Sequence, residues 1–380
     1  MKIRKFLVLA GEESGLIYAE RLKDALQNAQ PDAVMEFRGY QTEGFKTADL
    51  AVMGFWLVLK RLFFFLGVAR AMKRLIREWQ PEAVVTVDYP GLNLKLAAYA
   101  KARGIPAIHL VCPQVWAWHQ GRIPKVAAAI TKLLCFFPFE PPLFKGTGLD
   151  AKFIGHPLVD VFMGERYVSA QAAEQKDGAS ARLALLPGSR IGEIQRILPR
   201  LLQSIHLLKD LKNLKILIPA ANDKAYAEIE RQVSDNPPPA SCHIEILHGK
   251  ARDALRQADC AAVASGTATL EAALARCPTV LVYAVSPLLA WFARRVIKGV
   301  RHIGLANVIA EKTGMSPPMP ELLQEAFTPE TVAAQLVTWL SDSTARAQAV
   351  KALDATMEHL RSDGNAIGNA AREILACVQS

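Results

Sequence analysis

Short, largely apolar runs, each followed by an amphipathic stretch, recur along most of this chain and constrain its fold more than any other feature. Residues 6–10 (Phe-Leu-Val-Leu-Ala) and 83–87 (Ala-Val-Val-Thr-Val) are clear examples. A strand that is apolar on both faces is typical of a parallel sheet covered by helices. We therefore predict an α/β fold of doubly wound sheets. The predicted strands are residues 6–10, 33–37, 83–87, 107–111, 132–136, 152–154, 182–186, 215–218, 243–246, 260–263 and 279–282, and the clearest helices are 16–28, 55–79, 92–103, 121–129, 329–340 and 345–378.

The alternation runs twice, with a polar interruption between the two halves. Residues 164–181 are mostly polar or small and show no strand pattern. At about 150 residues per domain, a chain of 380 residues corresponds to two domains. We predict domains at residues 1–165 and 182–340, with the C-terminal helices, 345–380, joining the first. Because ligands of such sheets bind at the carboxyl ends of the strands, we expect the domains to face each other across a central cleft.

The composition excludes several classes of protein. Apolar residues make up 51% and charged residues 21%, which argues against a disordered chain. The six cysteines form no C-x-x-C pair, so a zinc site or disulfide framework is not expected and a reducing cytoplasm fits. The formal net charge of +9 suggests an anionic partner, but the chain shows no nucleic-acid-binding motif. No D-x-D pair occurs, so we expect no divalent metal held by that motif.

Two glycine- and hydroxyl-rich turns follow predicted strands in the second half. The strand 182–186 leads into Gly188, Ser189 and Arg190, where backbone amides, a helix N-terminus and a guanidinium would meet an anion. The strand 260–263 leads into Ser265, Gly266, Thr267, Thr269 and Glu271, whose carboxylate could accept both hydroxyls of a ribose. The alternatives are a plain strand–helix turn and a helix capped by Thr267. Together the two turns favour a site for a nucleoside diphosphate.

The predicted strand ends of the first half also carry candidate residues. Asp88 ends the strand 83–87 and is either a general base or the cap of the following turn. Further candidates on this side either line a pocket or pack in the core: Gly11, Glu13, Ser14, Gly15, Trp116 and His156.

An unusually apolar segment with basic neighbours lies between residues 50 and 77. Lys60 and Arg61 divide it into runs too short for a bilayer span. An apolar patch bordered by basic residues suits an anionic membrane surface or acyl chains, whereas the alternative is a fully buried helix. The candidate lipid-contacting residues are Val52, Met53, Phe55, Trp56, Phe63, Phe64 and Phe65.

Eight ordered motifs resemble the lipid-A-disaccharide synthases, glycosyltransferase family 19. They are Ala10-Gly-Glu-x-Ser-Gly15, Ala51-Val-Met-Gly54, Val87-Asp88-x-Pro90, Pro113-Gln-Val-Trp-Ala-Trp118, Phe137-Pro-Phe-Glu140, Gly155-His-Pro157, Leu186-Pro-Gly-Ser-Arg190 and Ser265-Gly-Thr-Ala-Thr-Leu-Glu271. The resemblance implies a GT-B-like pair of Rossmann-type domains and a peripheral enzyme on the cytoplasmic face of the inner membrane, acting without metal or cofactor and able to form homodimers.

The implied reaction joins UDP-2,3-diacylglucosamine to 2,3-diacylglucosamine 1-phosphate, giving lipid A disaccharide 1-phosphate and UDP. The resemblance gives Asp88 the role of base and Arg190 that of diphosphate stabiliser. It also places Glu271 at the ribose and Asn307 near the uracil or ribose. The rival functions are a UDP-sugar epimerase or hydrolase on the same scaffold and a non-catalytic relative that binds lipid or UDP-sugar.

Overall fold

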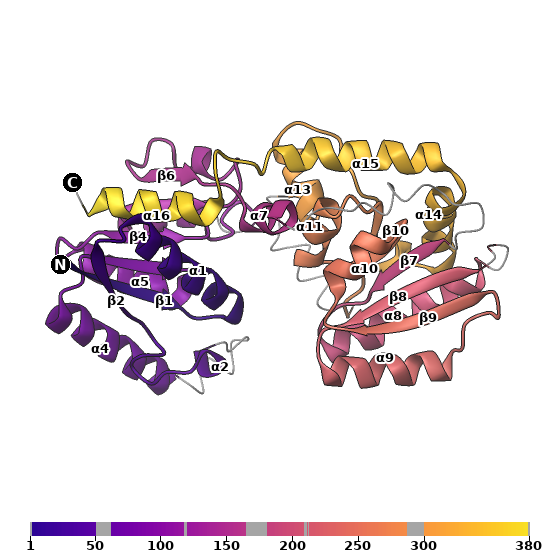
Figure 1. Ribbon diagram of the computed structural model, residues 1–380, viewed down its shortest axis with the longest axis horizontal. Helices are drawn as coiled ribbons and strands as arrows, with labels where there is room; N and C mark the ends of the chain where they lie inside the picture. Colours follow the sequence, from indigo (N-terminus) through magenta and orange to yellow (C-terminus); the bar gives the residue numbers. More distant parts are fainter. Residues whose placement is uncertain are drawn as a thin grey trace. The chain divides into compact units, whose positions relative to one another are not determined.

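The computed structural model describes residues 2–50, 62–117, 120–164, 181–208, 211, 213–286 and 300–378. The chain divides into two compact units: residues 1–160 with 360–380 form unit 1, and residues 161–359 form unit 2. Each unit is built on one six-stranded parallel sheet with interleaved helices (Figure 1). The α/β class predicted from the apolar runs is confirmed.

In unit 1 the strand order is β2-β1-β3-β4-β5-β6. The strands are β1 (Lys2–Ala10), β2 (Ala33–Arg38), β3 (Ala83–Val87), β4 (Ala107–Leu110), β5 (Lys132–Cys135) and β6 (Asp150–Phe153). The helices are α1 (Glu13–Ala29), α2 (Thr47–Leu50), α4 (Leu62–Trp79), α5 (Pro90–Lys101), α6 (Ile123–Ala129) and α16 (Ala366–Cys377), with 3-10 turns η1 (Gln120–Arg122) and η2 (Pro141–Phe144). Helix α7 (Pro157–Gly164) spans the boundary between the units.

The apolar character of β1 follows from the two helix layers that cover it. Phe6, Val8 and Ala10 face the layer that contains α1 and α16. Leu7 and Leu9 face the opposite layer, which contains α4 and α5. Since successive side chains of a strand point to opposite faces, the part of β1 that both layers cover, residues 6–10, is apolar at every position. Helix α16 packs beside α1, so a segment from the end of the chain completes the first core (Figure 1).

In unit 2 the strand order is β12-β11-β10-β7-β8-β9. The strands are β7 (Arg182–Leu186), β8 (Leu214–Ala220), β9 (Cys242–His248), β10 (Cys260–Ala264), β11 (Thr279–Tyr283) and β12 (Glu321–Leu323). The helices are α8 (Ile191–His206), α9 (Asp223–Asp235), α10 (Ala251–Gln257), α11 (Thr267–Leu274), α13 (Leu305–Lys312), α14 (Pro329–Ser341) and α15 (Ser343–Glu358), with the 3-10 turn η3 (Gln324–Ala326).

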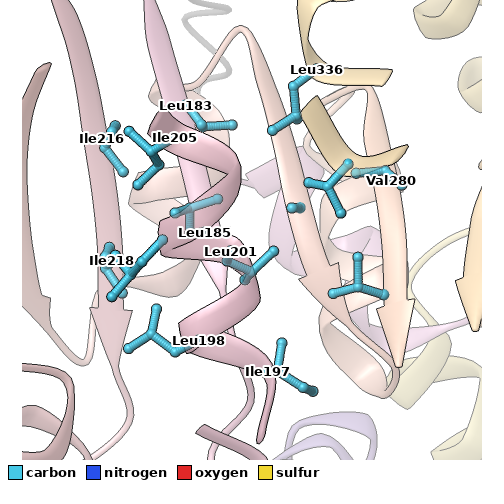
Figure 2. Packing of buried hydrophobic residues seen from close by; sticks show 14 of the residues in the cluster. Leu183, Leu185, Ile197, Leu198, Leu201, Ile205, Ile216, Ile218, Val280 and Leu336 are labelled. Carbon is cyan, nitrogen blue, oxygen red and sulfur yellow. The ribbon is translucent and has the colours of Figure 1, made fainter. Parts of the chain in front are cut away.

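Helix α8 fixes the centre of the second sheet. Figure 2 shows Leu198, Leu201 and Ile205 of this helix packed over β7 and β8, where their partners include Leu185 and Ile218. All of these side chains are fully buried. Burial of a Leu or Ile side chain contributes about 1.5–3 kcal/mol. The anchored helix therefore holds its N-terminus at the carboxyl end of β7.

Three features of the fold differ from the sequence-based expectation. Strand β12 was not expected, because it has three residues and begins with the acidic Glu321. The expected helix 345–378 is two helices, α15 and α16, separated by a turn that contains Gly364 at φ +75°. Helix α15 packs against α11, α13 and α14 within unit 2, so only residues 360–380 join the first unit. The expected helix 55–79 is described from Leu62, and residues 165–180 of the expected linker lie outside the described residues.

Among the described residues, none of the helices combines the length and the hydropathy that a membrane span requires.

Candidate functional site

A pocket of about 540 Å³ lies at the carboxyl ends of the central strands of unit 2. Both turns predicted from the sequence line it, one after β7 and the other after β10. The predicted residues found there are Gly188, Ser189, Arg190, Ser265, Gly266, Thr267 and Glu271. The two strands are neighbours in the sheet, which brings turns about 80 residues apart in sequence to one place.

The first turn aims the N-terminus of α8 at the pocket. Gly188 has φ +111°, and a Cβ there would lie 2.6 Å from Oε2 of Glu193. Glu193 accepts hydrogen bonds from the backbone N–H of Arg190 (3.4 Å) and from Nη1 of its guanidinium (3.3 Å). Glycine at 188 therefore lets the turn fold tightly against Glu193. The exposed first amides of α8 and Arg190 together form a site suited to phosphate oxygens.

The second turn opens α11 and positions Glu271 one turn further on. Gly266, not Thr267, is the N-cap, and the helix has no side-chain cap hydrogen bond. The alternative of a helix capped by Thr267 is therefore wrong. Glu271 is mostly buried, and its Oε1 accepts a hydrogen bond from Nε of Arg252 at 3.2 Å. Burial raises the pKa of Glu271, and the Arg252 guanidinium partly offsets this rise.

Two predicted nucleotide-binding residues are structural. Thr269 is fully buried; its hydroxyl donates to the carbonyl of Gly266 (2.8 Å) and accepts from the N–H of Leu305 (3.3 Å). Asn307 is also fully buried, and its amide donates to Met319 O (2.7 Å) and Glu321 Oε1 (2.8 Å). Its Oδ1 accepts the N–H of Met319 (3.0 Å). These side chains hold α13 against the sheet and do not line the pocket.

Sequence reasoning missed the part of the pocket formed by β8 and β9. Pro219 and Ala220 at the end of β8, the following Ala221, Gly249 and Ala251 form this part of the lining, and Leu186, Glu193, Ala264 and Ala268 complete it. The small residues at the ends of β8 and β9 form no motif that could have identified them. Their position became visible only when the order of the strands placed β8 beside β7.

In unit 1, Asp88 lies directly beyond the end of β3. Asp88 and Tyr89 have φ of +48° and +51°, a left-handed conformation that is unfavourable for non-glycine residues. The Asp88 carboxylate accepts the N–H of Tyr89 at 2.8 Å, and burial raises the pKa of this carboxyl. Tyr89 is the N-cap of α5, with no side-chain cap hydrogen bond. The Asp88 carboxylate therefore does hydrogen-bond the backbone of the turn that follows it, as the capping alternative expects, although Tyr89 is the N-cap of α5. Backbone strain of this kind is often found at functional sites.

A buried asparagine holds the strained turn at Asp88 in place. Asn93 donates through Nδ2 to the carbonyls of Leu9 (3.1 Å), Val87 (3.2 Å) and Asp88 (2.8 Å). Its Oδ1 accepts the hydroxyl of Tyr40 at 2.7 Å. Because an unpaired buried polar group costs about 1–3 kcal/mol, this network strongly favours one conformation at the ends of β1 and β3.

The acid on which the charge of Asp88 acts is Glu12, which was not among the candidates predicted from the sequence. The pKa of Glu12 is raised by burial and by the charge of Asp88, whereas Glu13 and Ser14 are exposed in the first turn of α1. Gly11 has no room for a side chain, whereas the contacts at Gly15 are ordinary. A Cβ at Gly11 would lie 2.4 Å from the Tyr89 ring. Strands β1 and β3 are paired, so Glu12, which follows the end of β1, comes near Asp88, which follows the end of β3.

Trp116 and His156 belong to a buried aromatic cluster. Trp116 donates through Nε1 to Glu140 at 3.1 Å and packs edge-on against Phe139. His156 accepts the N–H of Leu158 at Nδ1 (3.2 Å), and burial lowers its pKa to about 3. Both side chains are at most 6% exposed. The alternative of core packing therefore describes them better than a direct role in binding.

Cys112, Cys135 and Glu140 are the residues of the described part of the chain that come closest to a metal-ligand set. Their ligand atoms all lie within 4.8 Å of one another. Burial raises the pKa of the Cys135 thiol and of the Glu140 carboxyl, so both groups favour the protonated form, which is a poor metal ligand. The Glu140 carboxyl also accepts hydrogen bonds from Trp116 and from the N–H of Phe137. We interpret the cluster as structural.

The stability of unit 1 is expected to fall as the pH rises from 6.5 to 8. Burial raises the pKa of Glu140 from 4.5 to about 8, so in this window its carboxyl is protonated when folded and ionised when unfolded. The folded state then binds more protons, and stability decreases by at most about 1.4 kcal/mol per pH unit. The low pKa values of His109 and His156 act in the opposite direction, below pH 6.5.

Urea unfolding at half-unit steps from pH 6.5 to 8, with wild type and Glu140→Gln side by side, measures this effect. The glutamine keeps an acceptor for Trp116 but cannot ionise, so its stability should be flatter over the window. Equal slopes for the two proteins would contradict the assignment.

Comparison with known proteins agrees with this architecture. The pattern of the family described as lipid-A-disaccharide synthetase matches residues 6–375. The lipid-A-disaccharide synthase of Syntrophus aciditrophicus is 34% identical over 380 residues, covering 95% of this chain and 94% of the relative. That of Xanthomonas campestris pv. campestris is 36% identical over 356 residues, covering 89% and 78%.

Two solved structures share the fold. MurG of Acinetobacter baumannii has a TM-score of 0.61 at 15% identity, with 99% of this chain and 100% of that chain covered. A putative UDP-N-acetylglucosamine 2-epimerase of Listeria monocytogenes has a TM-score of 0.60 at 13% identity, with 100% and 96% covered. The fold alone therefore does not separate a transferase from an epimerase.

The two Rossmann-like sheets place this protein in the GT-B class of glycosyltransferase folds. Within that class, the match over nearly the whole chain decides the family. The chain belongs to the lipid-A-disaccharide synthases, glycosyltransferases of lipid A biosynthesis. The epimerase alternative is not favoured, because the similarity to that enzyme is limited to the fold.

Proposed function

We propose that the protein transfers a diacylglucosamine unit from UDP-2,3-diacylglucosamine to the 6-hydroxyl of 2,3-diacylglucosamine 1-phosphate. The products are a β(1→6)-linked disaccharide 1-phosphate and UDP. The observation that carries the proposal is the pocket of unit 2, where a helix N-terminus with Arg190 and the carboxylates of Glu193 and Glu271 line one cavity. This combination suits a nucleoside diphosphate better than a neutral ligand.

On the donor side, the amides of the first turn and Arg190 bind the diphosphate. They stabilise the negative charge that develops as UDP departs. Glu271 accepts the ribose hydroxyls, and the small residues at the ends of β8 and β9 leave room for the flat uracil ring. None of these steps needs a metal ion, since fixed cationic groups supply the charge.

On the acceptor side, Asp88 takes the proton from the attacking hydroxyl. Its partial burial and raised pKa make it a stronger base than an exposed aspartate. Attack by the hydroxyl on the side opposite the departing UDP inverts the anomeric carbon. Burial and the charge of Asp88 also raise the pKa of Glu12, so the net charge of this pair of carboxyl groups changes with pH.

Helix α4 supplies a surface suited to the membrane that contains both substrates. Phe63 is 86% exposed, and Leu62 and Leu66 are 44% and 41% exposed. Phe63, Leu66, Arg70, Arg74 and Arg77 recur every three or four residues, so an apolar end and a basic end share one exposed face. We propose that this face rests on the anionic inner leaflet of the inner membrane. Val52, Met53, Phe55 and Trp56, also predicted to contact lipid, lie outside the described residues.

Replacement of Leu62, Phe63 and Leu66 by serine should release the protein from anionic vesicles. Full burial of one such side chain in the membrane interface contributes about 1.5–3 kcal/mol to the free energy of binding. Loss of three partly buried side chains should therefore weaken binding at least about tenfold in vesicle pelleting. Phe64 and Phe65 are left intact, because they pack against the core. The matched control is Leu207→Ser with Val337→Ser, two exposed apolar residues of unit 2. Unchanged pelleting of the triple variant would exclude this face.

The direct test of the reaction is incubation of the purified protein with both diacylated substrates. We expect UDP and the disaccharide 1-phosphate in equal amounts, measured by chromatography and mass spectrometry. Donor and acceptor incubated separately serve as controls. Release of UDP from the donor alone would instead identify a hydrolase, and a change of the sugar configuration without release would identify an epimerase.

A further inference from the structure

Arg252 lies on α10 beside the pocket of unit 2 and contacts the carboxylate of Glu271, which lines that pocket. Its Nε donates to Oε1 of Glu271 at 3.2 Å, across the contact between α10 and α11. The Arg252 side chain is 42% exposed and that of Glu271 is 17% exposed. The ion pair is therefore partly shielded from water, and its charged hydrogen bond is stronger than that of a pair in full solvent.

This contact affects the ionisation and the orientation of the Glu271 carboxylate, the two properties that binding of a diol requires. A carboxylate accepts two hydroxyl hydrogens only when it is ionised, because a protonated carboxyl offers one oxygen as a donor. Burial opposes ionisation of Glu271 and Arg252 favours it. The guanidinium also fixes one carboxylate oxygen, which limits rotation of the group and presents the other oxygen in a fixed direction.

We propose that Arg252 is a positioning residue that orients the Glu271 carboxylate, and that the pair makes the pocket specific for a ribonucleoside diphosphate through its 2′,3′-diol. The inference rests on the proposed nucleotide site. It predicts that the effect of Arg252 appears only with ligands that carry the ribose hydroxyls.

Calorimetric titration with UDP and with 2′,3′-dideoxy-UDP tests this specificity. In the wild type, UDP should bind about tenfold more tightly, a difference of about 1.4 kcal/mol. Arg252→Ala should weaken UDP binding by nearly this factor and leave binding of the dideoxy nucleotide unchanged. Glu271→Gln should show the same pattern, and the double variant should be no weaker than Glu271→Gln alone, since both residues act through one interaction.

Two further variants separate positioning from a general charge effect. Arg252→Lys should recover part of the preference for ribose, because a lysine keeps the positive charge but not the planar donor group. Lys250→Ala removes a neighbouring exposed cation and should leave the preference unchanged.

The outcomes distinguish failure of the inference from failure of the proposed site. If the wild type binds neither nucleotide, the proposed nucleotide site itself is wrong. If the wild type and Glu271→Gln behave as expected but Arg252→Ala retains the full preference, the inference is overturned. Equal weakening of both nucleotides by Arg252→Ala would also overturn it, because the arginine would then act on the diphosphate.

Discussion

Replacement of Asp88 by asparagine is expected to lower turnover by about 10²- to 10⁴-fold, the usual contribution of a general base, with little change in UDP affinity. Asparagine is nearly isosteric and can still accept the N–H of Tyr89, so the strained turn should persist. It cannot take a proton from the acceptor hydroxyl. UDP binding should be preserved because the described lining of the nucleotide pocket belongs to unit 2.

The pH–rate profile adds a second test of this base. Because burial raises the pKa of Asp88, activity should fall on the acid side at a higher pH than the 3.8 of an ordinary aspartate. Glu20→Gln serves as the control, since Glu20 pairs with Lys23 on the exposed face of α1. Robust activity of Asp88→Asn alongside normal UDP binding would reject Asp88 as the base.

Replacement of Arg190 by alanine should lower kcat by about 10²- to 10³-fold, the typical cost of losing one donor that stabilises developing negative charge. Unlike Asp88→Asn, this variant should also bind UDP more weakly, because in the proposed mechanism Arg190 contacts the diphosphate in both the ground state and the transition state. Arg190→Lys should have a kcat and a UDP affinity between those of the wild type and Arg190→Ala, because lysine restores the charge without the planar donor group. Steady-state kinetics with UDP titrations measure both effects.

Arg231→Ala is the matched control for Arg190. Arg231 is exposed on α9 and pairs with Glu228 and Asp235, as Arg190 pairs with Glu193. Loss of such an exposed, solvent-screened pair costs little stability and should leave kcat and UDP affinity unchanged. If Arg190→Ala keeps both values as well, the first turn does not hold the leaving diphosphate.

The sequence predicted the glycine- and hydroxyl-rich turns well for a physical reason. A turn that must bring backbone amides close to a ligand needs glycine locally, and Gly188 shows this need in its φ of +111° and its contact with Glu193. The two strand–helix junctions are likewise local features. Their assembly around one cavity follows from the parallel pairing of β7 with β10, a strand order that the apolar runs did not specify.

Sequence patterns are less informative where the role of a residue depends on partners far along the chain. Thr269 and Asn307 are the residue types that bind nucleotides, but their partners are Leu305, Met319 and Glu321. Trp116 and His156 are similar cases. Trp116 donates to Glu140 and packs against Phe139, and His156 packs against Phe136 and Phe137. In the opposite direction, the pairing of β1 with β3 brings Glu12 near Asp88, whose charge helps to raise the pKa of Glu12.

The order of apolar and polar residues along the chain was enough to determine the α/β class, the parallel sheets and the turns that open α8 and α11, because each depends on neighbours within a few residues. Only the tertiary structure decided which polar side chains line a pocket and which are buried in the core with protein hydrogen-bond partners. The division of the last two helices between the units was also a tertiary decision. Residues far apart in sequence determine how deeply a side chain is buried and which hydrogen bonds it makes. Burial and hydrogen bonds in turn determine the pKa values of Asp88, Glu140 and Glu271.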